Sequence, residues 1–496
     1  MKILFVYPQY PVTYWGFQYA LKFVSKKASF PPLGLATVAA MFPENDEKRL
    51  IDLNVAKLKD KDLLWADYVM ISSMAVQRES AREVIDRCKA LGVKTVAGGP
   101  LFTSEPESFD DVDHLLLNEG ELTIPDFIRD LKAGKALHVY TSDQWADLRE
   151  TPVPLWKLID QKRYSTMNIQ YSRGCPFNCD FCNVTSLFGH VPRTKDTPQL
   201  LKELTALYES GWRGGVFFVD DNFIGNKRKL IQDVLPALID WMAEKNYPFA
   251  FLTETSINLA DDDKLMGMMV KAGFNTVFVG IESPNESSLA ECNKTQNKNR
   301  DLILSVKKIQ HSGLQVHAGF IVGFDNDNTT IFDSLIDFIQ QSGIAAAMVG
   351  LLNAPKGTKL YQRLAGEGRL LKGFTGDNTD FSMNFIPKMD RETLVKGYHR
   401  IVNTIYSPNR YYERILVFLQ EYNPIASSTG PISFNHIMAF FKSMIRLGIL
   451  EKERRYYWRL IFWSLVKRPQ VFPLAVTLSI YGYHFRKVFE NAALES

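Results

Sequence analysis

An α/β fold with two successive parallel sheets and a mostly helical C-terminal region is predicted by three observations. Short runs rich in valine, isoleucine, leucine and tyrosine alternate with helical stretches over roughly the first 350 residues. Buried parallel strands have this composition, and strands that alternate with helices form parallel sheets. Strand signals become few and aromatic residues many beyond residue 366. The stretch 141–163, with Pro152, Pro154 and several charges, predicts a linker between the two sheets.

Length and composition restrict the class of protein. A chain of 496 residues is too long for one hydrophobic core, and 46% apolar with 23% charged residues is ordinary for a soluble globular protein. The formal charge of +3 gives no reason to expect nucleic acid as a partner. Five cysteines, three of them clustered, fit a reducing cytoplasm. The N-terminal apolar run is too short for a signal peptide, so we expect a cytoplasmic protein.

Residues 1–140 predict a Rossmann-like sheet that binds its ligand at the carboxyl ends of the strands. The expected strands are Lys2–Tyr7, Arg49–Asp52, Tyr68–Ser72, Thr95–Ala97 and His114–Leu117, with helices that include Pro32–Met41 and Glu79–Leu91. The ends of these strands contain Ser72, Gly98, Gly99 and Glu119. The two glycines allow the backbone to approach a large flat ligand closely.

Residues 164–365 predict six βα units, the number in a partial (β/α)6 barrel. The expected strands are Met167–Ser172, Gly215–Val219, Phe249–Thr253, Thr276–Gly280, Gln315–Val322 and Ala347–Leu352. The expected helices are Pro198–Ser210, Asn226–Lys245, Asp261–Ala272, Lys298–Ser312 and Thr329–Ser342. In barrels of this type the chemistry takes place at the carboxyl ends of the strands.

The most informative motif is a Cys-x3-Cys-x2-Cys run formed by Cys175, Cys179 and Cys182, directly after the first predicted barrel strand. Three thiolates this close in sequence can hold three corners of a cubic iron–sulfur cluster and leave the fourth iron open. The alternatives are a zinc knuckle or buried thiols. Structural zinc sites prefer four ligands in paired Cys-x2-Cys sets, and His190 is the only nearby candidate for a fourth ligand.

The cysteine run closely resembles that of the radical S-adenosylmethionine (SAM) enzymes. This resemblance implies a [4Fe–4S] cluster at the three cysteines and SAM bound to its open iron. In this resemblance, the SAM-binding segments of the family correspond to successive strand ends of this chain. The positions implied to bind SAM are Phe181, Asp220, Asp221, Glu254, Glu282, Ser283, Gly319 and Gly323. At Asp220 and Asp221 the family usually has a Gly-Gly-Glu or similar turn, so a solvated acidic turn stays open as an alternative there.

A Rossmann-like domain with a Gly-Gly-Pro loop ahead of a radical SAM core resembles the cobalamin-binding domain of cobalamin-dependent radical SAM enzymes. By this resemblance Ser72, Gly98, Gly99 and Glu119 contact cobalamin. The chain departs from many cobalamin proteins because it lacks an Asp-x-His-x-x-Gly motif, which implies a cobalt without a histidine ligand. A degenerate domain that binds no cofactor is the alternative.

Residues 366–496 predict a helical domain with helices over Arg391–Ile405, Pro408–Gln420, 432–448, Arg454–Val466 and Val471–Phe489. Between 431 and 496 there are ten Lys or Arg against four Glu, interleaved with aromatic residues. This composition suits either contact with the inner face of a membrane or a helical cap with a solvated basic surface.

The layout of the three regions, including a C-terminal domain of the DUF4070 kind, resembles the bacterial hopanoid C-2 methylase group. The resemblance implies a methyltransferase that uses the [4Fe–4S] cluster, SAM and cobalamin to methylate an unactivated carbon of a small molecule, with a lipid or terpenoid preferred. It also implies a reductant such as flavodoxin or ferredoxin. A radical SAM oxidoreductase or cyclase without methyl transfer, and a non-catalytic iron–sulfur or cobalamin-binding regulatory protein, stay open as alternatives.

Overall fold

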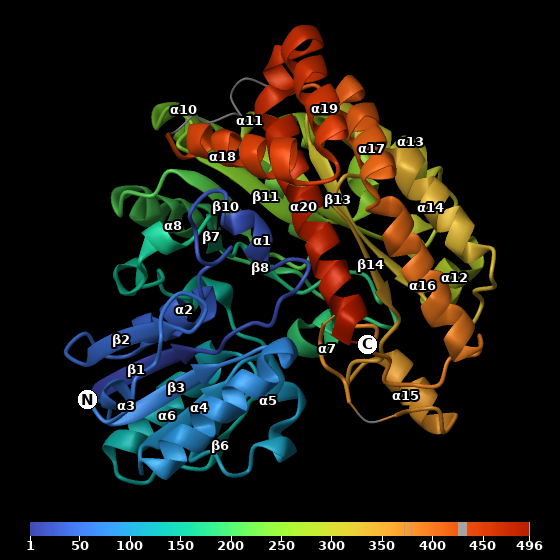
Figure 1. The fold of residues 1–496 in the computed structure, drawn as a ribbon. Helices are drawn as coiled ribbons and strands as arrows, with labels where there is room; N and C mark the ends of the chain where they lie inside the picture. The colour runs from blue at the N-terminus through green and yellow to red at the C-terminus, as the bar shows by residue number, and fades with distance from the viewer. Residues whose placement is uncertain (372, 378, 425–433, 496) are drawn as a thin grey trace.

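The computed structural model describes residues 1–371, 373–377, 379–424 and 434–495. Two six-stranded parallel sheets follow one another along the chain, and a group of helices at the C-terminal end packs against the second sheet (Figure 1). The predicted α/β class, with a Rossmann-like sheet, a partial barrel and a mostly helical C-terminal region, is confirmed.

The first sheet has the strand order β2-β1-β3-β4-β5-β6 and is covered by helices on both faces. Along β1, Ile3 and Phe5 pack in one cluster and Leu4 and Val6 in another, as the alternation of side chains along a strand requires. The strands are β1 (Lys2–Tyr7), β2 (Glu47–Asp52), β3 (Tyr68–Ser72), β4 (Lys94–Gly98), β5 (His114–Leu116) and β6 (Val139–Tyr140). The helices are α2 (Leu33–Met41), α3 (Asp60–Leu63), α4 (Arg78–Ala90), α5 (Pro100–Ser104) and α6 (Gly120–Lys132).

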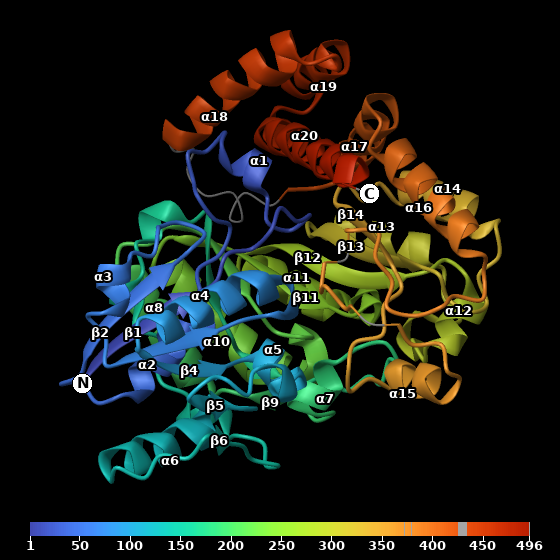
Figure 2. The ribbon, with the colours of Figure 1, turned by 60° about the horizontal axis from the view of Figure 1, so that its bottom comes forward.

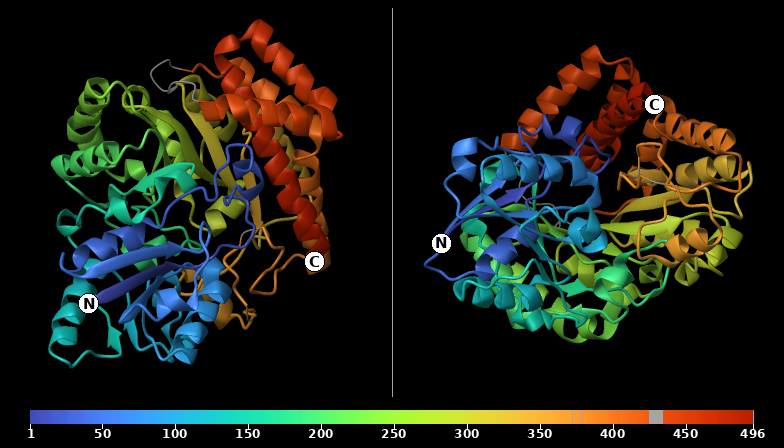
Figure 3. Two further views of the ribbon diagram at one scale, coloured as in Figure 1. Left: turned by 60° about the vertical axis from the view of Figure 1, so that its left-hand side comes forward. Right: turned by 90° about the horizontal axis from the view of Figure 1, so that it is seen from below.

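The second sheet has the order β14-β13-β12-β11-β10-β7 and curves into a half-barrel (Figure 3). Its strands are β7 (Thr166–Ile169), β10 (Gly214–Phe218), β11 (Phe249–Thr255), β12 (Phe274–Glu282), β13 (Gln315–Val322) and β14 (Ala347–Leu351). The accompanying helices are α7 (Val184–Phe188), α8 (Thr197–Glu209), α9 (Lys227–Lys229), α10 (Leu235–Glu244), α11 (Asp263–Lys271), α12 (Glu286–Glu291), α13 (Leu302–His311), α14 (Ile331–Ser342) and α15 (Lys359–Gly366). All six predicted barrel strands are therefore present: β13 has the predicted ends, and the ends of the other five are shifted.

Two predicted elements of the barrel are divided in the structure. The strand expected over Met167–Ser172 becomes β7 and the short strand β8 (Ser172–Arg173), which pairs antiparallel with β9 (Arg193–Thr194) and so encloses the cysteine run in a loop. The helix expected over Asn226–Lys245 is interrupted by a π-helical turn at Leu230–Val234. Pro236 follows that turn, and its missing N–H and bulky ring do not fit a regular helix interior.

The stretch predicted as a linker is packed against the rest of the protein. Three single 3-10 turns lie between 148 and 163, and Trp156 and Ile159 are buried in the main core. The backbone N–H of Leu155 donates to the carbonyl of Ala36 in α2. Prolines and charges predict irregular backbone correctly here, but they do not reveal that the irregular segment is buried.

The segment between β1 and α2 crosses to the barrel, which the sequence does not predict. It contains the short helix α1 (Gln18–Leu21), and its Trp15 lies edge-on to Phe278 of β12 with ring centroids 5.5 Å apart. The indole N–H of Trp15 also donates to Met348 Sδ at 2.9 Å. The inner wall of the half-barrel is therefore completed by a piece of the N-terminal region.

The C-terminal helices are α16 (Arg391–Ile405), α17 (Pro408–Glu421), α18 (Phe434–Ile445), α19 (Arg454–Lys467) and α20 (Phe472–Glu495). Each predicted helix is found, except that positions 432 and 433 of the 432–448 prediction lie outside the described residues. α20 reaches the segment between β1 and α2, where Phe485 stacks on Tyr14 at 4.1 Å. Within the described ranges, no helix combines the length and the apolar character needed to cross a membrane.

Candidate active site

The loop that carries the three cysteines is held by two adjacent carboxylates at the end of β10. Asp220 is 1% exposed and accepts the backbone N–H groups of Tyr171 and Ser172, while Asp221 accepts the N–H of Gly174 at 3.0 Å. Gly174 has φ 92°, a conformation that favours glycine, and a Cβ there would lie 3.0 Å from three carbonyl oxygens. These contacts fix the entry to the cysteine loop.

Cys175, Cys179 and Cys182 are half-buried beside one another. Burial raises the pKa of all three thiols, that of Cys182 to about 12, and neighbouring thiols add to the shift at Cys175 and Cys182. Side-chain amides contact two of the sulfurs: Asn222 Nδ2 lies 3.9 Å from Cys175 and Gln296 Nε2 lies 3.7 Å from Cys179. Amide donors to sulfur are among the contacts that tune iron–sulfur clusters, so these surroundings fit the group.

No group of three or more His, Cys, Asp or Glu side chains in the described ranges is arranged to hold a single metal ion. Three cysteines on a cubic cluster bind three different irons, which is a wider arrangement than the ligands of one ion. Cys88 is buried in α4, and Cys292 is buried beside the cysteine loop, where its carbonyl accepts the N–H of Asp180 at 3.0 Å.

A lysine that no sequence motif indicates lies next to the cysteine loop. Lys294 forms an ion pair with Glu282 at 2.7 Å, and the two side chains are 12% and 9% exposed. Its Nζ is 6.0 Å from the ring centroid of Phe181, and its charge lowers the pKa of the three thiols. Lys294 stands in a polar stretch with no motif, and only the return of the chain after α12 brings it to this place.

Carboxyl groups gather on the inner side of the barrel. Burial, together with repulsion from Asp221 and Asp220, raises the pKa of Glu254 to about 8, while burial raises that of Asp220 to about 7 and that of Asp221 to about 6. Lys294 acts in the opposite direction on Glu254. Adjacent carboxyls with raised pKa values are typical of a site that receives a cation.

The other predicted positions lie in the cysteine loop, directly after β12, and along and directly after β13. Phe181 packs edge-on against Phe324, with ring centroids 6.3 Å apart. Ser283 is fully buried and its hydroxyl accepts the N–H of Asn285. A Cβ on Gly319 would lie 3.0 Å from Phe278, and Gly323 has φ 106° at the turn that precedes Phe324. The structure thus brings these residues to one end of the barrel.

A cavity of about 680 Å³ lies between the first sheet and the barrel. One wall is formed by the strand ends of the first sheet, with Ser72, Gly98, Gly99 and Glu119. The opposite wall comes from the inner face of the barrel: Asn168, Gln170, Phe217 and Val219. A Cβ on Gly99, where φ is 94°, would lie 2.6 Å from Ser72 Oγ, so only glycine keeps this wall open.

Glu119 lines the cavity, but its carboxylate has partners in the protein. It accepts hydrogen bonds from Arg173 and Arg193, at 2.8 to 3.0 Å, and its side chain is 1% exposed. Arg173 also pairs with Glu121 at 2.8 Å. Because Arg173 lies two residues before Cys175, this buried network ties the cysteine loop to the first sheet.

Three protein families match successive parts of the chain. Residues 24–128 match the B12 binding domain, 169–339 the radical SAM superfamily, and 358–496 a domain of unknown function, DUF4070. An uncharacterized methyltransferase of Synechocystis sp. is 39% identical over 98% of this chain and 91% of its own length. The hopanoid C-2 methylase of Rhodopseudomonas palustris is 32% identical over 83% of this chain and 78% of its own length.

The chain belongs to the cobalamin-dependent radical SAM methyltransferases.

Solved structures of such enzymes share the fold. The cobalamin-dependent SAM radical enzyme OxsB, with aqua-cobalamin and SAM bound, aligns with a TM-score of 0.64 at 16% identity, over all of this chain and 80% of its own. The radical SAM methyltransferase TsrM from Kitasatospora setae, with cobalamin and a [4Fe–4S] cluster bound, aligns with a TM-score of 0.60 at 13% identity over 99% of each chain. The cofactors of this methyltransferase are a [4Fe–4S] cluster, SAM and cobalamin.

The half-buried carboxyl of Glu254 leads to a prediction about the pH dependence of stability. A folded-state pKa of about 8 lies above the unfolded value near ~4.3, so the folded methyltransferase holds a proton that the unfolded chain releases. The free energy of unfolding of cofactor-free protein should therefore fall as pH rises from about 5 to about 8. Glu254→Gln is expected to reduce this fall by roughly 2 kcal/mol in urea titrations.

The matched control is Glu392→Gln. Glu392 lies on α16 in an ion pair with Lys396, and both side chains are more than 70% exposed (75% and 73%). Its substitution should leave the pH dependence of unfolding unchanged. Equal slopes for the wild type and Glu254→Gln would contradict the burial of an ionisable group at this position.

Proposed function

We propose that this enzyme transfers a methyl group to an unactivated carbon of a lipid-like small molecule. The observation that supports this most directly is the shared cavity between the glycine-containing strand ends of the first sheet and the inner face of the barrel. A substrate in that space would contact the strand ends of the first sheet on one side and the inner face of the barrel on the other. Apolar walls such as Phe217, Leu35 and Ile124 suit a substrate with little polarity.

Cys175, Cys179 and Cys182 would hold the cluster, with Lys294 offsetting part of its negative charge. The bound cofactors supply a 5′-deoxyadenosyl radical and a transferable methyl group. The protein supplies orientation: Glu254 and Asp221 would receive the ammonium group of SAM, and Phe181 its adenine. The protein also supplies a site from which Trp15 and the surrounding segment exclude water.

The other predicted positions would contact a cofactor, shape the wall of the site or position neighbouring groups. Glu282 would contact SAM while it orients Lys294. Ser283, Gly319 and Gly323 would shape the wall at the same end of the barrel. At the cobalamin side, Ser72, Gly98 and Gly99 would face the cofactor directly. Glu119 and Asp220 would act through the groups they bind, because backbone amides or arginines occupy their carboxylates.

Incubation of the anaerobically reconstituted enzyme with methyl-labelled SAM, a reductant and total lipid extract tests the proposal. Label recovered in a lipid product, together with 5′-deoxyadenosine, is the expected result. Release of 5′-deoxyadenosine without label in any product would overturn methyl transfer in favour of another radical outcome. Comparison of lipids between a deletion strain and its parent identifies the substrate.

We also propose three properties of the setting in which the enzyme works. A small acidic electron carrier such as flavodoxin or ferredoxin would reduce the cluster. The enzyme would work in the cytoplasm and contact the inner face of the membrane through its C-terminal helices. The basic and aromatic composition of those helices supports this contact.

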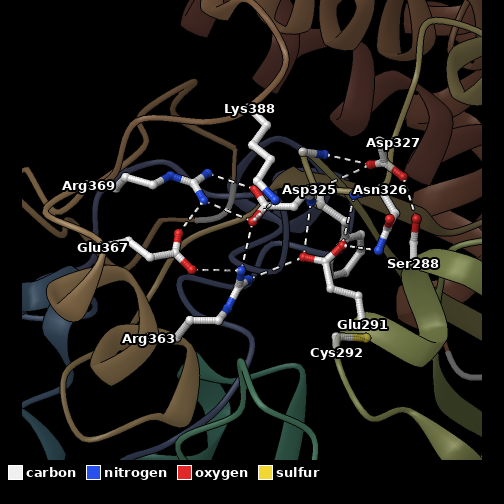
Figure 4. Close-up of polar contacts among 12 residues, drawn as sticks. Ser288, Glu291, Cys292, Asp325, Asn326, Asp327, Arg363, Glu367, Arg369 and Lys388 are labelled. Atoms are coloured by element: carbon white, nitrogen blue, oxygen red, sulfur yellow. Dashed lines mark hydrogen bonds and ion pairs between the residues drawn. The ribbon is translucent and has the colours of Figure 1, made fainter.

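An ion-pair cluster fixes the loop after β13 (Figure 4). Asp325 pairs with Arg363 and with Arg369, each at 2.7 Å, and its side chain is 6% exposed. Glu291 of α12 accepts the N–H of Asp325 and pairs with Arg363 at 3.2 Å. The same loop carries Phe324, so residues of the C-terminal region position one edge of the proposed adenine site.

Asp325→Asn is expected to destabilise the protein by roughly 2 kcal/mol, because two arginines lose their charged partner. It should also weaken SAM binding about tenfold, because the loop is then less ordered. A tenfold loss corresponds to about 1.4 kcal/mol of binding free energy. Although burial opposes it, the two arginines hold the pKa of Asp325 well below its usual range. The stabilisation is therefore present above pH ~4 and is lost as the pH falls further.

Urea denaturation and equilibrium dialysis with SAM measure these two effects. Asp333→Asn is the control, because Asp333 forms an exposed pair with Arg400 and such pairs contribute little. Iron content should be unaffected in both variants. Unchanged SAM affinity in Asp325→Asn would show that the loop does not shape the SAM site.

A further inference from the structure

The outer face of α18 and α19 exposes a group of large apolar side chains. In Figure 2 these two helices lie at the edge of the molecule, away from both sheets. Their inward faces are buried through residues such as Ala439, Tyr457 and Ile461. Nine large apolar side chains between 437 and 466 are instead at least 37% exposed: Ile437, Met438, Phe441, Ile445, Ile449, Leu450, Phe462, Leu465 and Val466. Single exposed apolar side chains are ordinary, but a group of this size marks an interaction surface.

The same stretch of chain is positively charged. Six of its side chains are exposed cations: Arg446, Lys452, Arg454, Arg455, Arg459 and Lys467. The two carboxylates of this stretch are both paired, Glu451 with Arg446 at 2.7 Å and Glu453, which is buried, with Arg486. This stretch therefore combines exposed apolar side chains with more cations than carboxylates.

We infer that this face of α18 and α19 docks on an anionic lipid bilayer. Apolar and aromatic side chains that enter the acyl boundary, flanked by cations that meet anionic headgroups, are the features of a helix that lies in a membrane interface. The inference deepens the proposed membrane contact by naming its residues and the charge of the lipid.

An acidic electron carrier would also be attracted by this charge, but the position of the face argues against it. Electrons must enter near Cys175, Cys179 and Cys182, in the loop that leads into α7. Figure 1 places α7 near one end of the barrel and α18 and α19 at the other. A carrier on the α18–α19 face would be remote from the thiols that it has to reach with an electron. A bilayer does not need to lie near the thiols.

The docking face continues to the cavity through the segment between β1 and α2. Lys442 Nζ on α18 donates to Ser25 Oγ at 2.7 Å and to the carbonyl of Lys22 at 3.3 Å. The same segment lines the cavity with residues such as Trp15 and Gln18. A lipid-like substrate that leaves the bilayer would meet this segment first, a consequence that rests on the proposed function.

Sedimentation of the reconstituted holoenzyme with vesicles tests the inference. We expect it to sediment with phosphatidylcholine–phosphatidylglycerol vesicles much more than with phosphatidylcholine alone, and less at high salt. Arg455→Glu combined with Arg459→Glu should weaken binding about tenfold or more, because each basic residue near an anionic surface contributes on that order. Phe441→Ser combined with Phe462→Ser should weaken binding to a similar degree by removing the apolar part.

The controls are exposed residues elsewhere. Leu304→Ser alters an apolar side chain that is 65% exposed on α13, and Lys396→Glu reverses a charge that is 73% exposed on α16. Both should leave vesicle binding unchanged. All variants should still cleave SAM in detergent solution, because none of these residues belongs to the proposed catalytic machinery.

The outcomes separate this inference from the proposed function. Absence of vesicle binding, or equal loss of binding in the controls, overturns the inference even if methyl transfer persists. Vesicle binding without methyl transfer from labelled SAM overturns the proposed function alone. If light scattering shows a dimer that Phe441→Ser with Phe462→Ser converts to a monomer, and vesicles do not bind, the occupant is a second copy of the chain and the lipid assignment falls.

Discussion

Replacement of Cys175, Cys179 or Cys182 with alanine is expected to abolish SAM cleavage and methyl transfer. Each thiolate is proposed to hold one iron of the cluster, so the loss of one leaves an incompletely ligated and labile centre. We expect a decrease in the rate of 5′-deoxyadenosine formation of at least ~10³-fold, equivalent to about 4 kcal/mol of barrier. Anaerobic reconstitution, iron analysis and electron paramagnetic resonance of the reduced protein measure the loss of the cluster independently of activity.

The other two cysteines provide matched controls. Cys88 is buried in α4 of the first sheet and should be dispensable for iron binding. Cys292 lies next to the cysteine loop, but its contact with Asp180 is made by the backbone carbonyl, so alanine preserves it. Cys88→Ala and Cys292→Ala should both retain full iron and a normal spectrum. Retention of a complete cluster in Cys175→Ala, or its loss in Cys292→Ala, would refute the proposed ligand set.

Gly99→Val is expected to separate methyl transfer from SAM cleavage. A Cβ at this position lies 2.6 Å from Ser72 Oγ on the wall of the cavity, and the branched side chain would extend into the space proposed for cobalamin. We expect cobalamin retention to fall about 100-fold, equivalent to ~2.7 kcal/mol, and methyl transfer to fall with it. Formation of 5′-deoxyadenosine should continue, because the cysteine loop lies outside the substituted wall.

The control for the backbone strain of this substitution is Gly134→Val. Gly134 also has a positive φ, 68°, but a Cβ there meets nothing within 4 Å. Both variants place a branched side chain at a residue with positive φ, so both backbones are strained. Only Gly99→Val also obstructs the cavity. Cobalamin content by absorbance, measured beside iron content, distinguishes them. Equal cobalamin content in the two variants would rule out this wall as the cobalamin site.

The candidate site brings carboxyl groups and a lysine together in a region with little access to solvent. Lys294 and Glu282 form a pair with little exposure, and Glu254 and Asp221 hold raised pKa values in the same region. A bound amino-acid group carries one positive and one negative charge, so it can satisfy the carboxyls and the lysine together. Under the proposed assignment of SAM to this site, such complementarity would offset the cost of placing ionisable groups inside the barrel.

Local patterns determined much of this protein without tertiary information. The strands Lys2–Tyr7, Tyr68–Ser72 and Gln315–Val322 were predicted with the ends that the structure has, because continuous apolar runs bounded by turn residues have few alternatives. The cysteine spacing indicated the radical SAM class, which the comparisons confirm, because three thiolates this close in sequence can hold three corners of one cluster. The family resemblance, matched to successive strand ends, implied the candidate SAM positions before any contact was known.

Tertiary structure alone decided which of those residues are free to bind a ligand. Asp220 and Glu119 resemble ligand contacts in the sequence, yet backbone amides and arginines occupy their carboxylates. Lys294 belongs to no recognisable sequence motif. Trp15 lies near the N-terminus and nevertheless contacts the barrel strand β12. Contacts between residues far apart in sequence depend on how separate elements pack, and no local pattern of apolar or polar residues encodes them. The sequence therefore specified the chemistry of the cofactors, and packing specified which side chains remain available to it.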